Sequence, residues 1–292
     1  MNTTNTNFVL APSAALASTV DAHVTVEAEY GSVVAEGSLY TAAHHQPGME
    51  DLPAPCNDKQ IPVLTEGTVL VSHLDLDSIG GCLRTVAGTT DTLFTDEYQS
   101  FWNLAHFVDI NGAHKLGESG ASDEDLLRLH AFWAWSKANV SRDHSREEVT
   151  DVTETIHTCK DAILSVLKND QAMLKAGQEM IDQTQALNEA TFERVLGNVI
   201  LRVTNEEKGF CNHLYTAPTG EGFAAVAAYN KEAGSITISL AESVDGVSCR
   251  DVMQGLFGME AGGHNGIAGS PREQFMTVEQ FENTATTLSE NI

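Results

Sequence analysis

The chain has 292 residues, of which 42% are hydrophobic and 20% are charged, a composition typical of a globular protein that can bury a core. Its net charge of −25 argues against stable binding of duplex nucleic acid, which needs a broad basic face. A small anionic substrate held by a metal and a few local cations is still compatible with this charge. No apolar run approaches the ~20 residues of a membrane helix, so we expect no membrane partner.

The N-terminal segment lacks a positively charged region, so we expect no signal peptide. The five cysteines are scattered and odd in number, which argues against a disulfide framework or a structural zinc cluster. We therefore expect a cytoplasmic protein. Cys82 lacks a histidine and an acid at a spacing that would make it a nucleophile, and it is expected to pack in the core.

The first third of the chain has the pattern of short strands. Residues 23–45 alternate in polarity like two strands joined near residues 30–32. A loop that contains prolines is expected over residues 46–62. A buried strand follows at residues 69–71, and a short helix is predicted over residues 82–88.

The middle of the chain is predicted to be mostly helical. Residues 97–108 are apolar at mixed spacing and are interpreted as a strand that ends at Asp109. From about residue 122 to residue 195 apolar residues recur at helical spacing, and the last such run extends over residues 191–200. Ser122 precedes three acidic residues, which predicts an N-cap and an acidic first turn. Aromatic side chains in this region could stack nucleobases, but at helical spacing they more often belong to a core. They are Phe101, Trp102, Phe132, Trp133 and Trp135.

The pattern changes again after about residue 210. Residues 223–230 and 235–241 are predicted strands joined by a turn. Residues 248–258 are predicted to form a helix with Ser248 as its N-cap. Residues 261–273 are interpreted as a glycine-rich loop that runs towards the C-terminus.

Three potential metal ligands follow the strand at residues 69–71, namely His73, Asp75 and Asp77. Alternate side chains of a strand point to one face, so the three are expected to share one small site. Imidazole and carboxylate ligands suit Mn, Mg, Fe or Zn. The carboxyl end of a strand is also where α/β proteins place their active sites. The alternative is that one aspartate caps the following helix and that His73 is structural.

Two further segments carry candidate ligands. Asp109, at the end of an apolar segment, could bridge two metals, or it could form an Asx-turn. His44 and His45 are adjacent, so on a strand they would point to opposite faces, and we predict that only one lies within coordination reach. Together with the first three residues they form a dinuclear set. Such sites hold metals ~3.5–4 Å apart and activate water for attack on phosphorus.

These motifs resemble those of the DHH phosphoesterase superfamily. Residues 72–81, SHLDLDSIGG, are similar to its first motif, a histidine with paired aspartates after a strand. Residues 107–114, FVDINGAH, are similar to its second motif, an aspartate at a strand end. Residues 235–273 resemble the DHH-associated C-terminal domain, whose GGGH-x-x-A-A-G loop corresponds to AGGHNGIAG at residues 261–269.

The chain departs from the family pattern at the Asp-His-His motif, which is absent after Asp109. The nearest string, at residues 142–145, is interpreted as a helix cap. His44 and His45 lie before the first motif and are a candidate for a displaced or permuted version of the missing one. No residue is assigned to the family's fourth aspartate.

The glycine-rich segment is expected to bind phosphate. Gly262 and Gly263 let backbone amides approach an anion closely. His264 can donate to a phosphate or stabilise a leaving oxygen. Arg272 can add a charged fork. The alternative is a surface turn with Arg272 in solvent.

The sequence thus predicts an α/β protein of two domains, with a mainly parallel sheet and the metal site in residues 1–195 and a smaller α/β domain in residues 205–292. The active site is expected in the cleft between them. By resemblance, the activity is metal-dependent hydrolysis of short oligonucleotides, cyclic dinucleotides or related nucleotides, with Mn as the expected metal and Mg, Fe or Zn as alternatives. The expected catalytic residues are Asp75, Asp77, Asp109 and His264.

Two other functions are kept open. One is hydrolysis of the pyrophosphatase type. The other is a nucleotide- or RNA-binding protein that has lost hydrolysis, which the missing Asp-His-His motif suggests. A homodimer is also left open.

Overall fold

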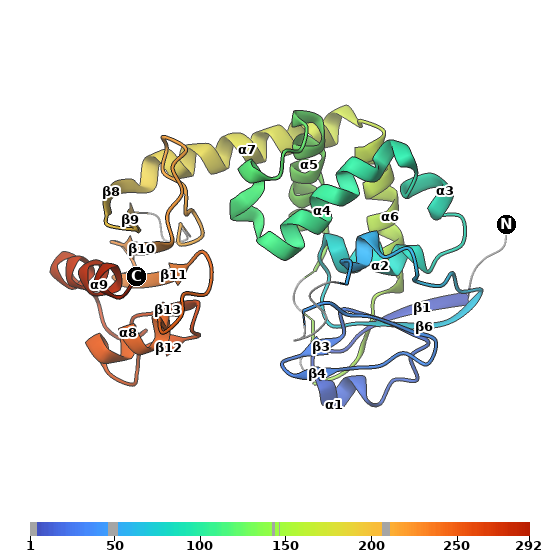
Figure 1. Cartoon of the computed structure of the whole chain (residues 1–292), viewed down its shortest axis with the longest axis horizontal. Coiled ribbons are helices and arrows are strands. Elements are labelled where there is room, and N and C mark those ends of the chain that lie inside the picture. The colour runs from blue at the N-terminus through green and yellow to red at the C-terminus, as the bar shows by residue number, and fades with distance from the viewer. Residues whose placement is uncertain (1–4, 46–51, 142–143, 146, 206–210) are drawn as a thin grey trace. The chain divides into compact units, whose positions relative to one another are not determined.

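The computed structural model describes residues 5–45, 52–141, 144–145, 147–205 and 211–292. The chain divides into two compact units, Met1–Met180 (unit 1) and Ile181–Ile292 (unit 2). Both contain helices and a sheet, which confirms the predicted α/β class (Figure 1). Within the part of the chain that the structure describes, no helix is long and apolar enough to span a membrane.

The unit 1 sheet has the strand order β5-β2-β6-β1-β7. Its first four strands are parallel and β7 pairs antiparallel with β1, so the sheet is mainly parallel, as predicted. Parallel strands are buried on both faces and therefore read as continuous apolar runs. The strands are β1 (Asn5–Leu10), β2 (Val24–Val26), β5 (Tyr40–Ala42), β6 (Glu66–Val71) and β7 (Thr150–Asp151).

Residues 23–45 hold more than the two strands that were predicted. A turn does lie at residues 30–32, but it joins the short strands β3 (Glu29–Tyr30) and β4 (Val33–Val34). The longer strands β2 and β5 pair in parallel, which a tight turn cannot connect. The β3–β4 hairpin is therefore part of the crossover between them.

Helices cover one face of the unit 1 sheet, and the β3–β4 hairpin with α1 lies on the other (Figure 1). The residues of β6 alternate between these faces. Val69 and Val71 pack in the main core below the helices, whereas Leu70 packs in a smaller alanine-rich cluster. The helices are α1 (Ala14–Ala17), η1 (Pro55–Asn57), α2 (Leu76–Arg84), α3 (Thr90–Leu93), η2 (Asp96–Tyr98), α4 (Gln99–Asn111), η3 (Ala113–Glu118), α5 (Asp123–Asn139) and α6 (Thr153–Leu167).

The strand predicted over residues 97–108 is wrong, because these residues form η2 and most of α4. Phe101, Trp102 and Phe132 are fully buried in the unit 1 core, and Trp133 and Trp135 pack against it. The interpretation of the aromatic residues as core is therefore confirmed. Cys82 also lies in this core, and all five cysteines are free and buried.

Most of the helical region at residues 122–195 is confirmed as α5, α6 and α7 (Gln171–Thr191). The Ser122 hydroxyl accepts a hydrogen bond from the Asp125 amide, as an N-cap should. The helix expected over residues 191–200 is wrong. Most of these residues form β8 (Phe192–Leu196) and the start of β9 (Val199–Thr204), which are joined by a tight turn where Gly197 has a φ of +57°.

Unit 2 is built on a sheet with the order β12-β13-β11-β10-β9-β8. The predicted strands and turn are confirmed as β10 (Ala225–Asn230) and β11 (Ser235–Leu240), and the predicted helix as α8 (Cys249–Phe257) with its Ser248 cap. The glycine-rich segment is not a loop throughout, because it folds into the hairpin β12 (Gly262–Gly263) and β13 (Ile267–Gly269). An unpredicted helix, α9 (Val278–Asn291), follows.

A buried arginine ties the end of α7 to unit 2. The Arg202 guanidinium donates to the Asn188 carbonyl and side chain, to the Thr191 hydroxyl and to two further carbonyls. Because these bonds satisfy a side chain with 0% exposure, breaking them would be costly. Residues 181–195 thus group with unit 2, whereas the sequence-based boundary placed them in the first domain.

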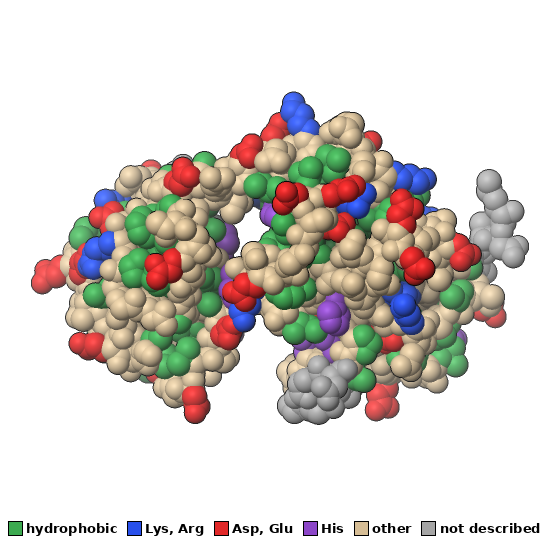
Figure 2. Space-filling model, turned by 45° about the horizontal axis from the view of Figure 1, so that its top comes forward, with side chains coloured by type: hydrophobic (Ala, Val, Ile, Leu, Met, Phe, Trp, Pro, Cys, Tyr) green, Lys and Arg blue, Asp and Glu red, His purple; other side chains and the backbone are tan. Residues whose placement is uncertain are grey.

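Acidic side chains are spread over the visible face of each unit, as expected from the net charge of −25 (Figure 2). Lys and Arg side chains are fewer and scattered among them.

Two glycines let α2 pack closely against its neighbours. A Cβ atom added at Gly81 would lie 2.6 Å from side-chain atoms of both Pro55 and Val26. One added at Gly80 would lie 2.6 Å from the Cβ of Cys56. The pair of glycines after the SHLDLDS segment therefore serves helix packing, which brings α2 against η1 and the end of β2.

We predict that Gly81→Ala destabilises unit 1. In an open helical position this change would stabilise by roughly 1 kcal/mol, but here the new methyl group meets two packed side chains, and overpacking costs about 1–3 kcal/mol. Denaturant unfolding should register the loss. Gly117→Ala is the control, since nothing lies within 4 Å of its added Cβ. Equal stability of the two variants would contradict the packing argument.

Candidate metal centre

The carboxyl ends of β5, β2 and β6 lie side by side at one edge of the unit 1 sheet. Val26, the last residue of β2, is level with Ala42 of β5 and with Val71 of β6. Residues just past these ends therefore meet at the edge where parallel sheets commonly place active sites. They are Glu27, His44, His45 and His73.

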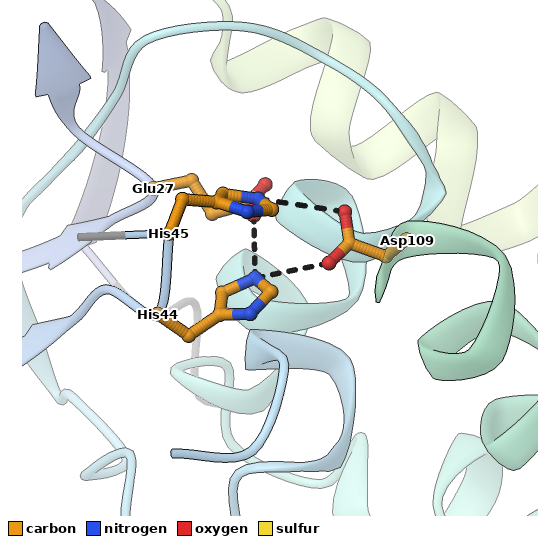
Figure 3. A group of neighbouring side chains, drawn as sticks. All are labelled: Glu27, His44, His45 and Asp109. Carbon is orange, nitrogen blue, oxygen red and sulfur yellow. Dashed lines mark hydrogen bonds and ion pairs between the residues drawn. The ribbon is translucent and has the colours of Figure 1, made fainter. Parts of the chain in front are cut away.

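Four side chains form the first group of potential metal ligands: Glu27, His44, His45 and Asp109 (Figure 3). Both histidine Nε2 atoms lie close to Glu27 Oε1, at 3.0 Å for His44 and 3.1 Å for His45. The Asp109 carboxylate faces them from α4, 3.0 Å from His44 Nε2 and 3.7 Å from His45 Nε2. One ligand atom from each residue lies within 4.8 Å of all the others, which is compact enough for one metal ion.

A second group consists of Glu27, His73 and Asp75. His73 Nε2 lies 3.4 Å from Glu27 Oε2 and 3.1 Å from Asp75 Oδ2. The His73 and Asp75 side chains are about half exposed, at 49% and 46%. This group therefore opens to solvent, whereas Glu27 and His44 in the first group are buried.

Glu27 belongs to both groups, because its Oε1 faces the first and its Oε2 faces the second. Its backbone has a φ of +47°, a conformation that costs a non-glycine residue roughly 1–2 kcal/mol. The neighbouring strands hold it there. Its N–H donates to the Ala42 carbonyl, and its own carbonyl accepts from the Ser72 hydroxyl. A strained residue held in this way is typical of a functional site.

Asp75 and Asp77 have different surroundings. Asp75 Oδ1 accepts from the Ser78 amide, which confirms that Asp75 caps α2, while its Oδ2 faces His73. Asp77 is 3% exposed, and its Oδ1 accepts from the Cys56 amide. Its Oδ2 lies 4.0 Å from His44 Nε2. β6 ends at Val71, so the prediction that strand alternation puts His73, Asp75 and Asp77 in one group is wrong.

The buried carboxylates fit a cation. Asp77 Oδ2 is buried and has no hydrogen-bond partner among the described residues, whereas Glu27 Oε2 is buried beside His73 in an ion pair. A buried charge without a partner is costly unless a counter-ion is present. Burial and the charges of Glu27 and Asp109 raise the pKa of Asp77 well above its ordinary value. A bound divalent cation would remove this conflict by stabilising the ionised form.

The histidines balance part of the charge of the carboxylates. Burial opposes protonation of His44, but hydrogen bonds with Asp109 and Glu27 outweigh it and raise its pKa to about 10. The hydrogen bond with Asp75 raises the pKa of His73 to about 9. A histidine must be neutral to bind a metal, so metal binding here would release these protons.

The turn η1 fixes one side of the centre. The Cys56 N–H of this turn donates to Asp77 Oδ1 at 2.9 Å, and the N–H of Ala54, the residue before the turn, donates to His106 Nδ1 at 3.1 Å. The turn is itself held by Arg84, whose Nε donates to the Cys56 carbonyl at 2.7 Å. The close packing of α2 on η1 therefore sets the position of Asp77.

Beside the second group lies a pocket of about 390 Å³. Its polar lining includes Ser72, His73 and Asp75, and Leu10, Pro12 and Leu74 add apolar surface. This volume is within the range of small-ligand sites. A substrate bound there would lie next to the exposed ligands of the metal centre.

Two predictions about the candidate ligands, one for the histidine pair and one for Asp109, differ from the structure. The prediction that only one of His44 and His45 reaches the site is wrong, because both follow the end of β5, where strand alternation no longer applies. Asp109 does reach the site, but from helix α4 and not from a strand end. Of the string interpreted as a helix cap, Arg142 and Asp143 lie outside the described residues.

Two residues that contribute to this site were missed in the sequence. Glu27 directly follows the apolar strand residues 24–26, which is the same signal that identified His73. His106 lies one helical turn before Asp109, but this relation is visible only once α4 is known to be a helix. Both omissions therefore arose from the assignment of local structure.

In unit 2, the predicted phosphate-binding residues line one cavity of about 970 Å³: Gly262, Gly263, His264 and Arg272. Glu260 and Glu273 also line it, so it is not purely basic. Gly263 has a φ of +147°, and a Cβ there would lie 2.4 Å from Ala268 Cα. The close pairing of the β12–β13 hairpin therefore depends on this glycine.

The tip of the hairpin is anchored to the start of α8. The Asn265 carbonyl accepts from the Cys249 amide, and its side-chain oxygen accepts from the Ser248 hydroxyl. Arg250 Nε donates to the Gly263 carbonyl at 2.8 Å. These bonds leave the neighbouring His264 side chain exposed at the cavity.

No protein-family model matches the chain, and no curated protein sequence does. Among solved structures, it is similar to RecJ from Thermus thermophilus in complex with Mn²⁺, with 14% identity and a TM-score of 0.39, over 91% of this chain and 40% of that one. A manganese-bound exonuclease RecJ matches at 14% identity and a TM-score of 0.35, over 87% of this chain and 69% of that one. An uncharacterized protein from Helicobacter pylori matches at 9% identity and a TM-score of 0.21, over 77% and 75% of the two chains.

We predict that Glu27→Gln weakens binding of Mn²⁺ at both groups, because the shared carboxylate loses its charge. Loss of an outer partner of a ligand typically costs about 10–100-fold in affinity, and loss of a shared ligand should cost more. Calorimetric titration should give two ions per chain for the wild type and fewer, weaker ones for the variant. Glu66→Gln, an exposed acid on β6, is the control. Wild-type stoichiometry in Glu27→Gln would contradict the assignment.

Proposed function

We propose that this chain is a metal-dependent phosphoesterase that hydrolyses phosphodiester bonds of short oligonucleotides, cyclic dinucleotides or related nucleotides. The observation that carries the proposal is the sharing of Glu27 between two groups of ligands. A carboxylate with one oxygen toward each group suits a bridge between two cations. In this proposal the chain is a divergent, permuted member of the DHH superfamily.

The permutation explains the missing motif. His44 and His45 lie before the first motif, and Glu27 contacts both, so this acid takes the place of the leading aspartate that the pair lacks. Asp109 completes the same group from α4 and is a candidate for the fourth acid that the sequence left unassigned. The two groups then contain the ligands of a complete dinuclear centre.

Each set of residues has a defined role in this proposal. When bound, a pair of divalent cations supplies positive charge to the phosphoryl transition state and makes water a nucleophile near neutral pH. Glu27, His44, His45 and Asp109 would hold one ion, and Glu27, His73 and Asp75 would hold the other. Asp77, fixed by the Cys56 amide, faces the first group with its free oxygen.

The donor set favours manganese. It mixes several carboxylates with imidazoles, and oxygen-rich sets with some nitrogen ligands suit Mn more than Ca. Mg, Fe and Zn are alternatives with similar ligand preferences. The metal is therefore best identified by metal analysis of the purified protein and by comparing its activity with each ion.

In unit 2, we assign phosphate binding to the cavity of the hairpin. His264 can donate to a phosphate oxygen, and Arg272 can add a bidentate contact. In a chain with a net charge of −25, such local donors are needed to offset repulsion of an anionic ligand.

We expect Asp75→Asn to abolish Mn-dependent hydrolysis without unfolding the chain. Asn caps a helix about as well as Asp, so α2 keeps its N-cap, whereas Ala would cost about 1 kcal/mol. The change removes only the charge that faces His73. Turnover of a dinucleotide should be measured beside metal content, with Asp91→Asn, an exposed acid of α3, as the control. Full turnover in Asp75→Asn would contradict the ligand assignment.

We expect His264→Ala to reduce turnover by about 10–100-fold, the value of a charge-assisted hydrogen bond formed mainly in the transition state. Arg272→Ala should act more on KM, because a guanidinium fork binds ground state and transition state alike. Steady-state kinetics and metal analysis separate these effects, and Lys231→Ala in the β10–β11 turn is the control for loss of a cation. Metal loss in His264→Ala, or unchanged kinetics in both variants, would contradict the role of the cavity.

A screen over dinucleotides, cyclic dinucleotides and pyrophosphate, with Mn present or chelated, tests the proposal as a whole. Turnover of a phosphodiester that chelation abolishes is the expected result. Preference for pyrophosphate would favour the pyrophosphatase alternative. Ligand binding that survives chelation, without turnover of any substrate, would identify a binding protein instead.

A further inference from the structure

His106 is a histidine at the metal centre that belongs to neither group of ligands. It lies on α4 three residues before Asp109, so the two side chains share one helix face, with Cβ atoms roughly 5–6 Å apart. Burial lowers its pKa, and the nearby positive charge of His44 lowers it further, against the effect of Asp109. The ring is therefore close enough to the first group to sense its charges.

The hydrogen bond with Ala54 fixes the tautomer of His106. The Ala54 amide donates to Nδ1 at 3.1 Å, so Nδ1 carries no proton and acts as the acceptor. In the neutral ring the proton must then lie on Nε2. Among the described residues Nε2 forms no hydrogen bond, and it is not a buried atom without a partner. It is therefore a donor that is open to a ligand.

This arrangement excludes the two usual roles of a histidine at such a site. Nε2 bears the proton and Nδ1 is occupied, so neither nitrogen has a lone pair available for a metal. A neutral imidazole would become an anion if it gave up its only N–H proton, so it is also unsuited to proton donation. What it can provide is a directed, uncharged hydrogen bond.

We propose that His106 is a catalytic residue whose Nε2–H donates a hydrogen bond to a non-bridging oxygen of the scissile phosphate, an inference that rests on the proposed function. The proton stays on His106 throughout, and no bond to the residue forms or breaks. Charge on the phosphoryl oxygens is stabilised best by donors that are fixed before the reaction. His106 is fixed twice, by helix α4 and by the amide of Ala54, the residue before η1.

Two substitutions separate the donor from the anchor. The side-chain oxygen of His106→Asn can take the place of Nδ1 and still accept from Ala54, but nothing replaces Nε2–H. The longer side chain of His106→Gln can put an N–H near the position of Nε2, but it gives up the Ala54 bond. A purely structural His106 would therefore be replaced better by Asn, and a donor better by Gln.

The Mn-loaded full chain should be assayed on a dinucleotide. We expect His106→Asn to lower kcat by about 10²–10³-fold, as for removal of one preorganised donor, with little change in KM or in Mn²⁺ stoichiometry. His106→Gln should recover a large part of this loss. Wild-type kcat in His106→Asn, or a loss in His106→Gln as large as that in His106→Asn, would overturn the proposal.

Binding of inorganic phosphate to the Mn-loaded protein gives a readout that does not need turnover. We expect His106→Asn to weaken phosphate binding by about 10-fold and His106→Gln to weaken it less. If the wild type hydrolyses no phosphodiester, the proposed function fails while this measurement still tests the hydrogen bond. Equal phosphate affinity in the wild type and His106→Asn would overturn the inference, whatever the activity.

Discussion

A single buried carboxylate, that of Glu27, is the constraint on which the rest of unit 1 depends. Its two oxygens face different sets of side chains, so it must sit where ligands can approach from both sides. The end of β2, the strand between β5 and β6, is such a place. The cost of its left-handed backbone is offset by hydrogen bonds with Ala42 of β5 and with Ser72, which directly follows β6.

The helices complete the centre by packing closely. Gly80 and Gly81 bring α2 against η1, and η1 and the residue before it present the amides that orient Asp77 and His106. α4 then contributes Asp109 from above the sheet. A shift of α2 by less than the width of a methyl group would therefore move the Asp77 carboxylate, because closely packed interiors transmit strain.

Local sequence patterns predicted which residues lie at the candidate centre better than they predicted how these residues are arranged. The prediction that His73 and Asp75 lie together is confirmed, because strand, side chains and helix cap are adjacent in sequence. Asp109 was found for the wrong reason, since the aromatic residues of α4 obscured the helical period. Glu27 was missed because the end of a short strand is inconspicuous until the pairing of β2 with β5 puts two histidines beside it.

The same limit applies to unit 2. The strands β10 and β11 and helix α8 were predicted from alternation and from the Ser248 cap, which are local signals. The β8–β9 hairpin was not, because its apolar residues also fit a helical period, and the buried Arg202 that fixes it finds its partners only after folding. Tertiary contacts override local periodicity in such segments.

Part of the acidic charge of the chain is concentrated at the candidate metal centre. Glu27, Asp75, Asp77 and Asp109 place four carboxyl groups around three histidines, and the raised pKa of Asp77 reflects the repulsion among the acids. Two divalent cations would balance four carboxylates and displace protons from the histidines. An anionic phosphate would then meet a neutral centre instead of a negative one. In a chain of net charge −25, metal binding is therefore what would make the site compatible with the proposed substrates at all.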